Sequence, residues 1–284
     1  MKETRPSDLQ YQDTAAYIGR FTPKTPSTIL DVGCGSGGLA AVLGEMGHRV
    51  SPIDSSEEAV EKARAKGIAA EQADFLQFRG GPFDVVLFSY ALHHIAPLEQ
   101  AVDQVRKLLA PGGRLILEEF AIERVDAATA AWFFGTQDVL VASGLLGDTE
   151  ASGVFEGKEP LARWRERFEP GRHKGEGHGV GHRGKHGTGK HITGEPAHKG
   201  HGREGHGHFS EKLHDGDAMR EAVAERFTVR FEERTPALAR FWLHRMDKPS
   251  LAVARQLAAL ERLLIAQGMI RPFGFRMVAE AKQQ

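Results

Sequence analysis

The stretch Ile29–Ala40, ILDVGCGSGGLA, joins a short apolar run to the start of a helical pattern. The apolar run passes through Asp31, and glycines follow at alternate positions, Gly33, Gly35 and Gly37. Glycine lets a backbone approach a ligand without a Cβ clash, and the first turn of the next helix presents free N–H groups. In an open α/β sheet, ligands bind outside the carboxyl ends of the strands. The stretch therefore predicts a ligand-binding loop in an α/β fold.

Apolar runs alternate with helical patterns from about residue 27 to residue 120. The runs are nearly continuous, as expected of strands that are buried on both faces. They cover residues 28–33, 48–54, 83–89 and 113–120, with a weaker strand at about 68–72. This alternation predicts a Rossmann-like, doubly wound α/β fold, with a mostly parallel sheet and helices on both faces. The alternating patterns of residues 228–234 and 273–281 add an antiparallel C-terminal edge strand.

The composition is that of a globular protein. The 284 residues include 37 basic and 38 acidic side chains, so bulk charge does not indicate a nucleic-acid or membrane surface. The single cysteine, Cys34, excludes an internal disulfide, and nothing near it in the sequence would activate its thiol. No apolar run approaches the roughly 18 residues of a membrane helix, and the N-terminus lacks a signal-peptide pattern. These features predict a cytoplasmic protein.

Two classes of ligand fit the glycine loop taken alone. Gly33, Gly35 and Gly38 satisfy GxGxxG, which would indicate a nicotinamide-dependent oxidoreductase. Asp54, at the end of the second strand, suits the ribose hydroxyls of either class of ligand. Asp31 favours the other class, because a carboxylate at this point would repel a pyrophosphate and attract an ammonium group.

Further segments separate the two classes. Asp74 and Phe75, after the third strand, offer an acceptor for an exocyclic amine and a ring against a base. The blocks FDVVLFSYALHHI (83–95) and LLAPGGRLIL (108–117) follow. In order and spacing these segments resemble the class I S-adenosylmethionine-dependent methyltransferases, especially the small-molecule branch that includes quinone-biosynthesis methyltransferases. The resemblance covers roughly residues 27–120.

The resemblance implies a cofactor, S-adenosylmethionine, and methyl transfer to a small molecule by in-line displacement. The cofactor-binding residues that it implies are Asp31, Gly33, Gly35, Gly37, Asp54, Asp74, Phe75 and Ser89. Such a displacement depends mainly on alignment in a dry pocket, worth roughly 7–11 kcal/mol, and needs no nucleophilic side chain. His94 is the candidate general base for the acceptor, with a histidine satisfied by backbone as the alternative.

The resemblance also divides the chain. Residues 1–26 are expected to form an N-terminal helical cap, and residues 27–147 the S-adenosylmethionine-binding core. Residues 148–215 are expected to form a lid region, and residues 216–284 complete the sheet and add helices on the substrate side.

Side chains outside the motifs have expected places as well. Tyr11 and Tyr17 of the N-terminal helix are expected to cover the cofactor. Strand alternation sends either Glu118 or Glu119 toward the pocket and leaves the other in solvent. One group of aromatic residues is expected either to wall an apolar substrate or to pack helices together: Trp132, Phe133, Phe134, Phe241 and Trp242.

Residues 171–208 differ from the rest of the chain. They hold nine of the 14 histidines and 13 of the 33 glycines, with Val180 and Ile192 as their large apolar residues. This composition predicts a disordered insert in the lid region, with weak, adventitious binding of divalent metals as a secondary property. A His-rich metal-handling protein is the third functional hypothesis, although the sequence lacks the CxxC or HExxH spacing of a built metal site.

The sequence also narrows the methyl acceptor. It has no NPPY or DPPY tetrapeptide, no Pro-Cys pair, and no basic stripe outside the His-rich insert. One cysteine is fewer than resemblance to an arsenite methyltransferase would require. The expected partner is therefore a small-molecule substrate, with no nucleic acid and no membrane.

Overall fold

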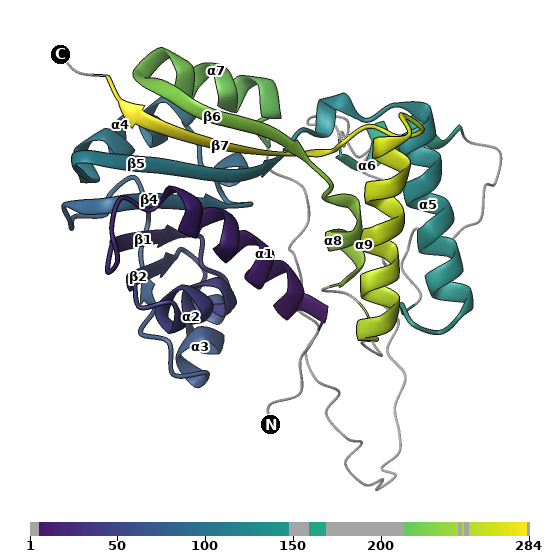
Figure 1. Ribbon diagram of the computed structural model, residues 1–284, viewed down its shortest axis with the longest axis horizontal. Coiled ribbons are helices and arrows are strands. Elements are labelled where there is room, and N and C mark those ends of the chain that lie inside the picture. The colour runs from purple at the N-terminus through teal and green to yellow at the C-terminus, as the bar shows by residue number, and fades with distance from the viewer. Residues whose placement is uncertain (1–5, 148–158, 169–212, 244–245, 247–249, 283–284) are drawn as a thin grey trace, which may run out of the picture.

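The computed structural model of the chain describes residues 6–147, 159–168, 213–243, 246 and 250–282 (Figure 1). In this part of the chain seven strands form one sheet, in the order β3-β2-β1-β4-β5-β7-β6. The strands are β1 (Thr28–Val32), β2 (Arg49–Asp54), β3 (Glu71–Gln72), β4 (Phe83–Ser89), β5 (Leu109–Phe120), β6 (Phe227–Thr235) and β7 (Gly274–Ala281). The predicted Rossmann-like α/β fold class is confirmed.

One strand of the sheet is reversed. The pairs from β3 to β5 are all parallel, whereas β7 runs antiparallel to both β5 and β6. The predicted antiparallel pairing of the last two strands at the sheet edge is confirmed, with β6 as the edge strand and β7 between β6 and β5. Residues 274–279 of β7 are all buried, whereas β6 exposes charged side chains, so the more apolar strand takes the inner position.

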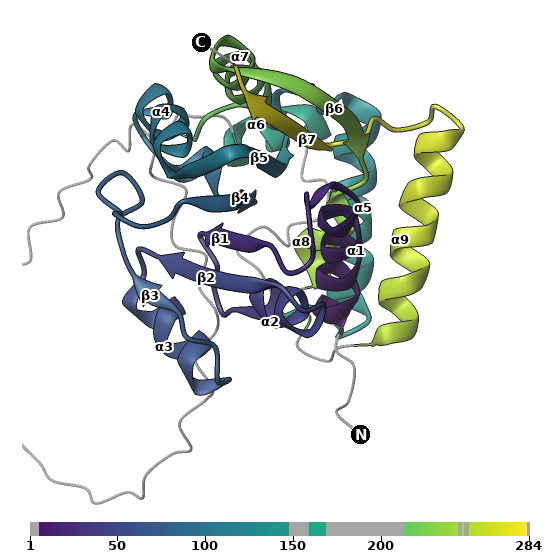
Figure 2. The ribbon, with the colours of Figure 1, turned by 60° about the vertical axis from the view of Figure 1, so that its left-hand side comes forward.

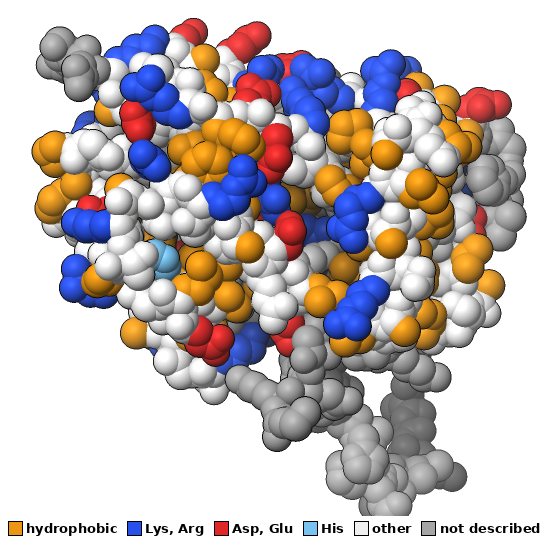
Figure 3. All heavy atoms as spheres, in the orientation of Figure 1, with side chains coloured by type: hydrophobic (Ala, Val, Ile, Leu, Met, Phe, Trp, Pro, Cys, Tyr) orange, Lys and Arg blue, Asp and Glu red, His pale blue; other side chains and the backbone are white. Residues whose placement is uncertain are grey.

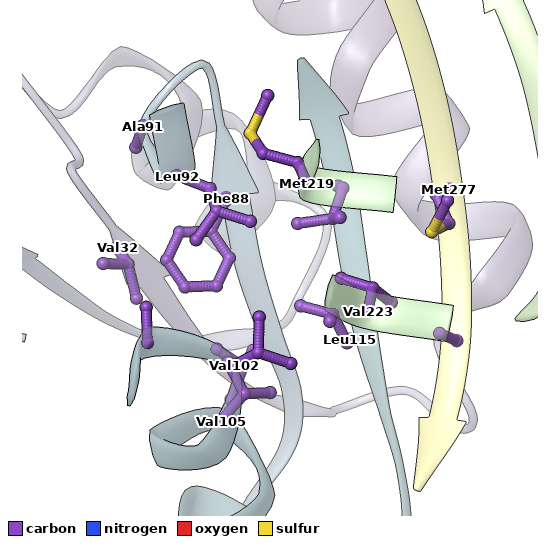
Figure 4. Packing of buried hydrophobic residues seen from close by; sticks show 14 of the residues in the cluster. Val32, Phe88, Ala91, Leu92, Val102, Val105, Leu115, Met219, Val223 and Met277 are labelled. Carbon is purple, nitrogen blue, oxygen red and sulfur yellow. The ribbon is translucent and has the colours of Figure 1, made fainter. Parts of the chain in front are cut away.

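Helices cover both faces of the sheet (Figure 2). The helices of the Rossmann-like part are α1 (Pro6–Phe21), α2 (Gly38–Glu45), α3 (Glu57–Ala65), α4 (Leu98–Leu108) and α7 (Gly216–Arg226). Successive strand residues point to opposite faces. The residues that pack with α1 and α2 include Ile29, Val85, Ile116 and Val278. Their neighbours pack with α4 and α7 and include Leu30, Val86, Leu115 and Met277, of which Figure 4 labels Leu115 and Met277.

A second cluster of helices lies beyond the end of β5 (Figure 1). It consists of α5 (Ala127–Ala142), α6 (Pro160–Phe168), α8 (Leu238–Leu243) and α9 (Leu251–Ala266). Phe133, Phe134 and Trp242 are each 1% exposed in its core, which confirms the helix-packing interpretation for these three residues. Trp132 and Phe241 are only partly buried. The sequence predicted α5 and α9 but not the short helices α6 and α8.

Some predictions concern parts of the chain that this structure does not test. The His-rich insert, 171–208, lies outside the described residues, so its predicted disorder and metal binding stay predictions. The predicted domain boundaries also stay predictions. No helix of the described residues is long and apolar enough to span a bilayer.

Candidate functional site

The loop between β1 and α2 has the backbone geometry that glycine allows. Gly33, Gly35 and Gly37 have φ angles of 72°, 54° and 75°, which other residues rarely adopt. A Cβ on Gly33 would lie 2.5 Å from the Cβ of Ala91, whereas one on Gly35 would meet no atom within 4 Å. Gly33 therefore lets the loop touch the segment after β4, and Gly35 leaves its own side open to a ligand.

Asp54, at the end of β2, holds this loop in place. Its Oδ2 accepts a hydrogen bond from the backbone N–H of Gly35 at 2.9 Å, and its Oδ1 accepts one from Ser56 at 2.9 Å. A carboxylate has about four acceptor positions, so both oxygens can accept further donors. The structure thus brings the predicted ribose-binding carboxylate against the predicted glycine loop.

Asp31 is buried beneath the same loop. Its side chain lies in β1 and the residue is 1% exposed, and Oδ2 has no hydrogen-bond partner among the described residues. Burial, followed by the negative charge of Asp54, raises the pKa of Asp31 to about 7. A buried acceptor without a donor is unfavourable, and a buried unpaired charge is more so. This oxygen is therefore suited to receive a cationic donor.

Asp74 and Phe75 take different places after β3. The backbone N–H of Ala73 donates to the Asp54 carbonyl at 2.9 Å, which brings the exposed Asp74 close to the loop. Phe75 is 4% exposed and packs edge-to-face on Phe88, with ring centroids 5.2 Å apart. Phe75 is thus part of the core beside the loop, and its predicted place against the adenine base stays a prediction.

The segment after β4 turns sharply at the carboxyl end of the sheet. Tyr90 has a φ of 59°, an uncommon conformation for a bulky residue. Its backbone N–H donates to the carbonyl of Glu118 at 2.8 Å. The Oε1 of Glu119 accepts from the backbone N–H groups of Ala91 and Leu92, at 2.9 and 2.6 Å. These bonds from the end of β5 hold the turn in its strained conformation.

The two adjacent histidines differ in environment. His93 is 5% exposed, and its Nδ1 lies 2.6 Å from Oε2 of Glu119. His94 is exposed, with its ring centroid 4.1 Å from that of His93, and its backbone N–H donates to Ala91. His93 therefore belongs to the buried support of the turn, and His94 is the histidine that solutes can reach.

Glu118 belongs to a buried network that the sequence analysis missed. Its carboxylate accepts from Thr14 of α1 at 2.6 Å and from Nε of Arg276 in β7 at 2.8 Å, and Oγ of Ser89 lies 3.5 Å away. Glu118 is 3% exposed and Glu119 is fully buried. The expectation that one of the two faces solvent is therefore wrong, because each has its own set of buried donors.

The two tyrosines of α1 do not share one role. Tyr17 is 2% exposed in the core and its ring lies against Phe21 and Phe231, so the expectation that it covers the cofactor is wrong. Burial also raises the pKa of Tyr17 far above its usual range. Tyr11 lies directly on Gly38, where a Cβ would be 2.2 Å from its ring. Tyr11 thus packs at the start of α2, beside the glycine loop.

Thiol chemistry has little support at this site. Burial, and then the charges of Asp31 and Asp54, raise the pKa of the half-buried Cys34, so its thiol stays protonated. This agrees with the expected unreactive cysteine. Within the described ranges, no group of three or more His, Cys, Asp or Glu side chains is placed to hold a metal ion.

Comparison with known proteins identifies the family. A family model described as a methyltransferase domain matches residues 3–173, which is more than half of the chain. The chain belongs to the methyltransferase domain family. The match includes the glycine loop, Asp54 and the turn after β4, and it selects this family over the nicotinamide-dependent oxidoreductases that the glycine pattern alone allowed.

Curated relatives of this methyltransferase match over part of their length. The ubiquinone biosynthesis O-methyltransferase of Xylella fastidiosa is 33% identical over 133 residues, which cover 44% of this chain and 53% of that protein. The malonyl-[acyl-carrier protein] O-methyltransferase of Enterobacter lignolyticus is 28% identical over 130 residues, covering 44% and 52%. The chain thus spans about half the length of these relatives.

Solved structures support the fold. A putative S-adenosylmethionine-dependent methyltransferase from Listeria monocytogenes superposes with a TM-score of 0.52 at 19% identity, covering 97% of this chain and 99% of that chain. An S-adenosylmethionine-dependent methyltransferase from Mesorhizobium loti gives 0.50 at 18% identity, covering 95% and 99%. At these identities the likeness concerns the fold alone.

Proposed function

We propose that this methyltransferase transfers a methyl group from S-adenosylmethionine to a small-molecule acceptor by in-line displacement. The observation that carries the proposal is the buried Oδ2 of Asp31, which has no partner in the described part of the chain, beneath a glycine loop whose open side lies at Gly35. S-Adenosylmethionine has an ammonium group, which suits a carboxylate that has no donor of its own. Two of the relatives are named as O-methyltransferases, which supports an oxygen acceptor.

The residues present fit this cofactor. Asp31 would hold the ammonium group, and the glycine loop allows close approach of the backbone. Asp54 would accept from the ribose hydroxyls, because its two oxygens each hold a single backbone donor. Asp74 would accept from the adenine amine, and Ser89 would line the methionine end, at the carboxyl end of β4.

The chain's own residues would position the acceptor and take up its proton. When bound, S-adenosylmethionine supplies an electrophilic methyl group on a sulfonium. His94, exposed after the strained turn, is the proposed base at the acceptor hydroxyl. The Glu119 bonds to the turn and to His93 fix where His94 lies.

The charges on the face seen in Figure 3 agree better with a small-molecule acceptor than with a nucleic acid. Basic and acidic side chains are mixed over the face seen in Figure 3, without a continuous basic stripe on that face. The His-rich insert remains a predicted site of weak metal binding and takes no part in the proposed mechanism.

Calorimetric titration with S-adenosylmethionine tests the proposal. Wild-type protein should bind the cofactor, and Asp54→Ala should weaken or abolish binding because the loop and the ribose both lose their acceptor. Asp103→Ala is the matched control, since Asp103 of α4 pairs with Arg226 of α7, away from the loop. A wild-type protein that binds NADH and not S-adenosylmethionine would overturn the proposal.

A further inference from the structure

An arginine lies on the turn after β4. Arg240 belongs to α8, which follows β6 and lies beside α9 (Figure 1). Its guanidinium carbon is 3.8 Å from the centre of the Tyr90 ring, within the range of a cation–π contact. Tyr90 directly follows Ser89, at the carboxyl end of the sheet where ligands bind in α/β folds. Arg240 is thus a cation at the entrance to the proposed active site.

Among the described residues, no carboxylate pairs with Arg240. In the part of the chain that the structure describes, its one recorded contact is the Tyr90 ring, and no carboxylate lies within ion-pair distance. The nearby Glu118 is neutralised by Arg276, and Glu119 is occupied by His93 and two backbone N–H groups. A guanidinium has five N–H donors, and within the described ranges no recorded hydrogen bond uses those of Arg240.

The surface around this guanidinium is aromatic. Phe120 lies with its ring centroid 4.3 Å from Tyr90 and 5.0 Å from Phe241, and all three rings are only partly buried. Phe241 is also the neighbour of Arg240 in α8. A molecule in this position would therefore contact flat apolar rings together with one guanidinium group.

We propose that the methyl acceptor carries a carboxylate, that Arg240 binds this carboxylate, and that the apolar body of the acceptor lies on the rings of Tyr90, Phe120 and Phe241. The inference rests on the proposed methyl transfer and names its substrate class. A carboxylate suits the site better than a phosphate ester does, because it has a single charge and a planar shape that matches one guanidinium in a bidentate pair. Arg240 is then a specificity-determining residue and leaves the methyl-transfer step to the groups around Ser89 and His94.

Paired acids and amides test this inference. Protein saturated with S-adenosylhomocysteine would be titrated with 3,4-dihydroxybenzoate and with its primary amide, and separately with decanoate and decanamide. At least one acid should bind about tenfold or more tightly than its amide, since the amide removes the charge and changes the shape little. Arg240→Gln should reduce this preference to within about twofold, and Arg240→Lys should keep part of it.

The matched control is Arg230→Gln. Arg230 lies on the edge strand β6, is mostly exposed and pairs with Glu280, so this variant should keep the full preference. Equal binding of acid and amide in both wild-type pairs would overturn the inference, as would a preference that survives in Arg240→Gln. Wild-type protein and Arg240→Lys decide the question if the glutamine variant does not fold. S-Adenosylhomocysteine binding is measured first, and its absence in wild type would count against the proposed function and not against Arg240.

Discussion

The protonation of Asp31 should be coupled to cofactor binding. Burial and the charge of Asp54 raise the pKa of Asp31 from 3.8 to about 7 in the protein without ligand. At 1.36 kcal/mol per pKa unit, ionised Asp31 costs roughly 4 kcal/mol more than an exposed aspartate. Because the folded-state pKa lies above the unfolded one, the ligand-free protein should lose stability as the pH rises from about 4 to about 7, with no further loss above that range.

Without a ligand, burial favours the protonated form of Asp31, and a bound ammonium group reverses this preference. It favours the ionised carboxylate, so binding of S-adenosylhomocysteine, which carries the same ammonium group, requires Asp31 to lose its proton. The affinity should fall about tenfold for each pH unit below about 7, and should be about 30-fold weaker at about pH 5.5 than at about pH 8. Near pH 6, about 0.9 proton should leave for each molecule bound.

Calorimetry in two buffers of different ionisation enthalpy measures both the affinity for S-adenosylhomocysteine and the number of protons released on binding. Asp31→Asn should remove the pH dependence, weaken binding at about pH 8 by roughly tenfold to a hundredfold, and stabilise the ligand-free protein at that pH. Asp84→Asn, at the start of β4 and so at the opposite end of the sheet, should keep the wild-type slope. A wild-type affinity that is constant over this range would refute the reasoning. A slope that persists in Asp31→Asn would instead assign the proton to another group, such as His94.

Three further predictions concern the loop, the buried network and the candidate base. Gly33→Ala should abolish S-adenosylhomocysteine binding in calorimetry, because the new Cβ would clash with the turn after β4 and the residue has a positive φ. The control Gly44→Ala, in α2, has free space for its Cβ and should stabilise the fold by roughly 0.5–1 kcal/mol. Glu118→Gln should lower the free energy of unfolding, measured by urea denaturation, by about 3–5 kcal/mol. The control Glu280→Gln should lower it by less than about 1 kcal/mol, because the ion pairs of Glu280 are partly exposed. His94→Gln should lower kcat by about 10²–10⁴, with cofactor affinity unchanged. A kcat within about threefold of wild type would assign the proton to solvent.

The glycine loop and its carboxylates could be predicted because they depend on local sequence. Gly33 and Gly35 need φ angles that glycine adopts readily, so their spacing after an apolar strand indicates the loop directly. Asp54 could be assigned because it ends the next strand of a parallel sheet, where strand ends meet at one edge. Asp31 could be placed under the ligand, although its missing hydrogen-bond partner and its raised pKa could not be predicted.

The buried network around Glu118 could not be predicted, because its residues are far apart in the chain. Glu118 is 104 residues from Thr14 and 158 residues from Arg276, and no periodic pattern links them. Strand alternation alone therefore predicted that one of Glu118 and Glu119 faces the pocket and the other faces solvent. Tyr17 was misplaced for the same reason, since the ring of Phe231 that buries it comes from β6.

The strands, most of the helices, the glycine loop and the methyltransferase family could be predicted, because each rests on local propensity, hydrophobic period or motif spacing. The folded structure was needed to show that β7 enters the sheet between β5 and β6, that Glu118 and Glu119 are both buried, and that Arg240 lies on Tyr90. These features depend on which surfaces meet when distant segments pack, and on the charges left unpaired when they do. The cofactor loop could therefore be predicted from the sequence, whereas the proposed acceptor site could be identified only in the folded structure.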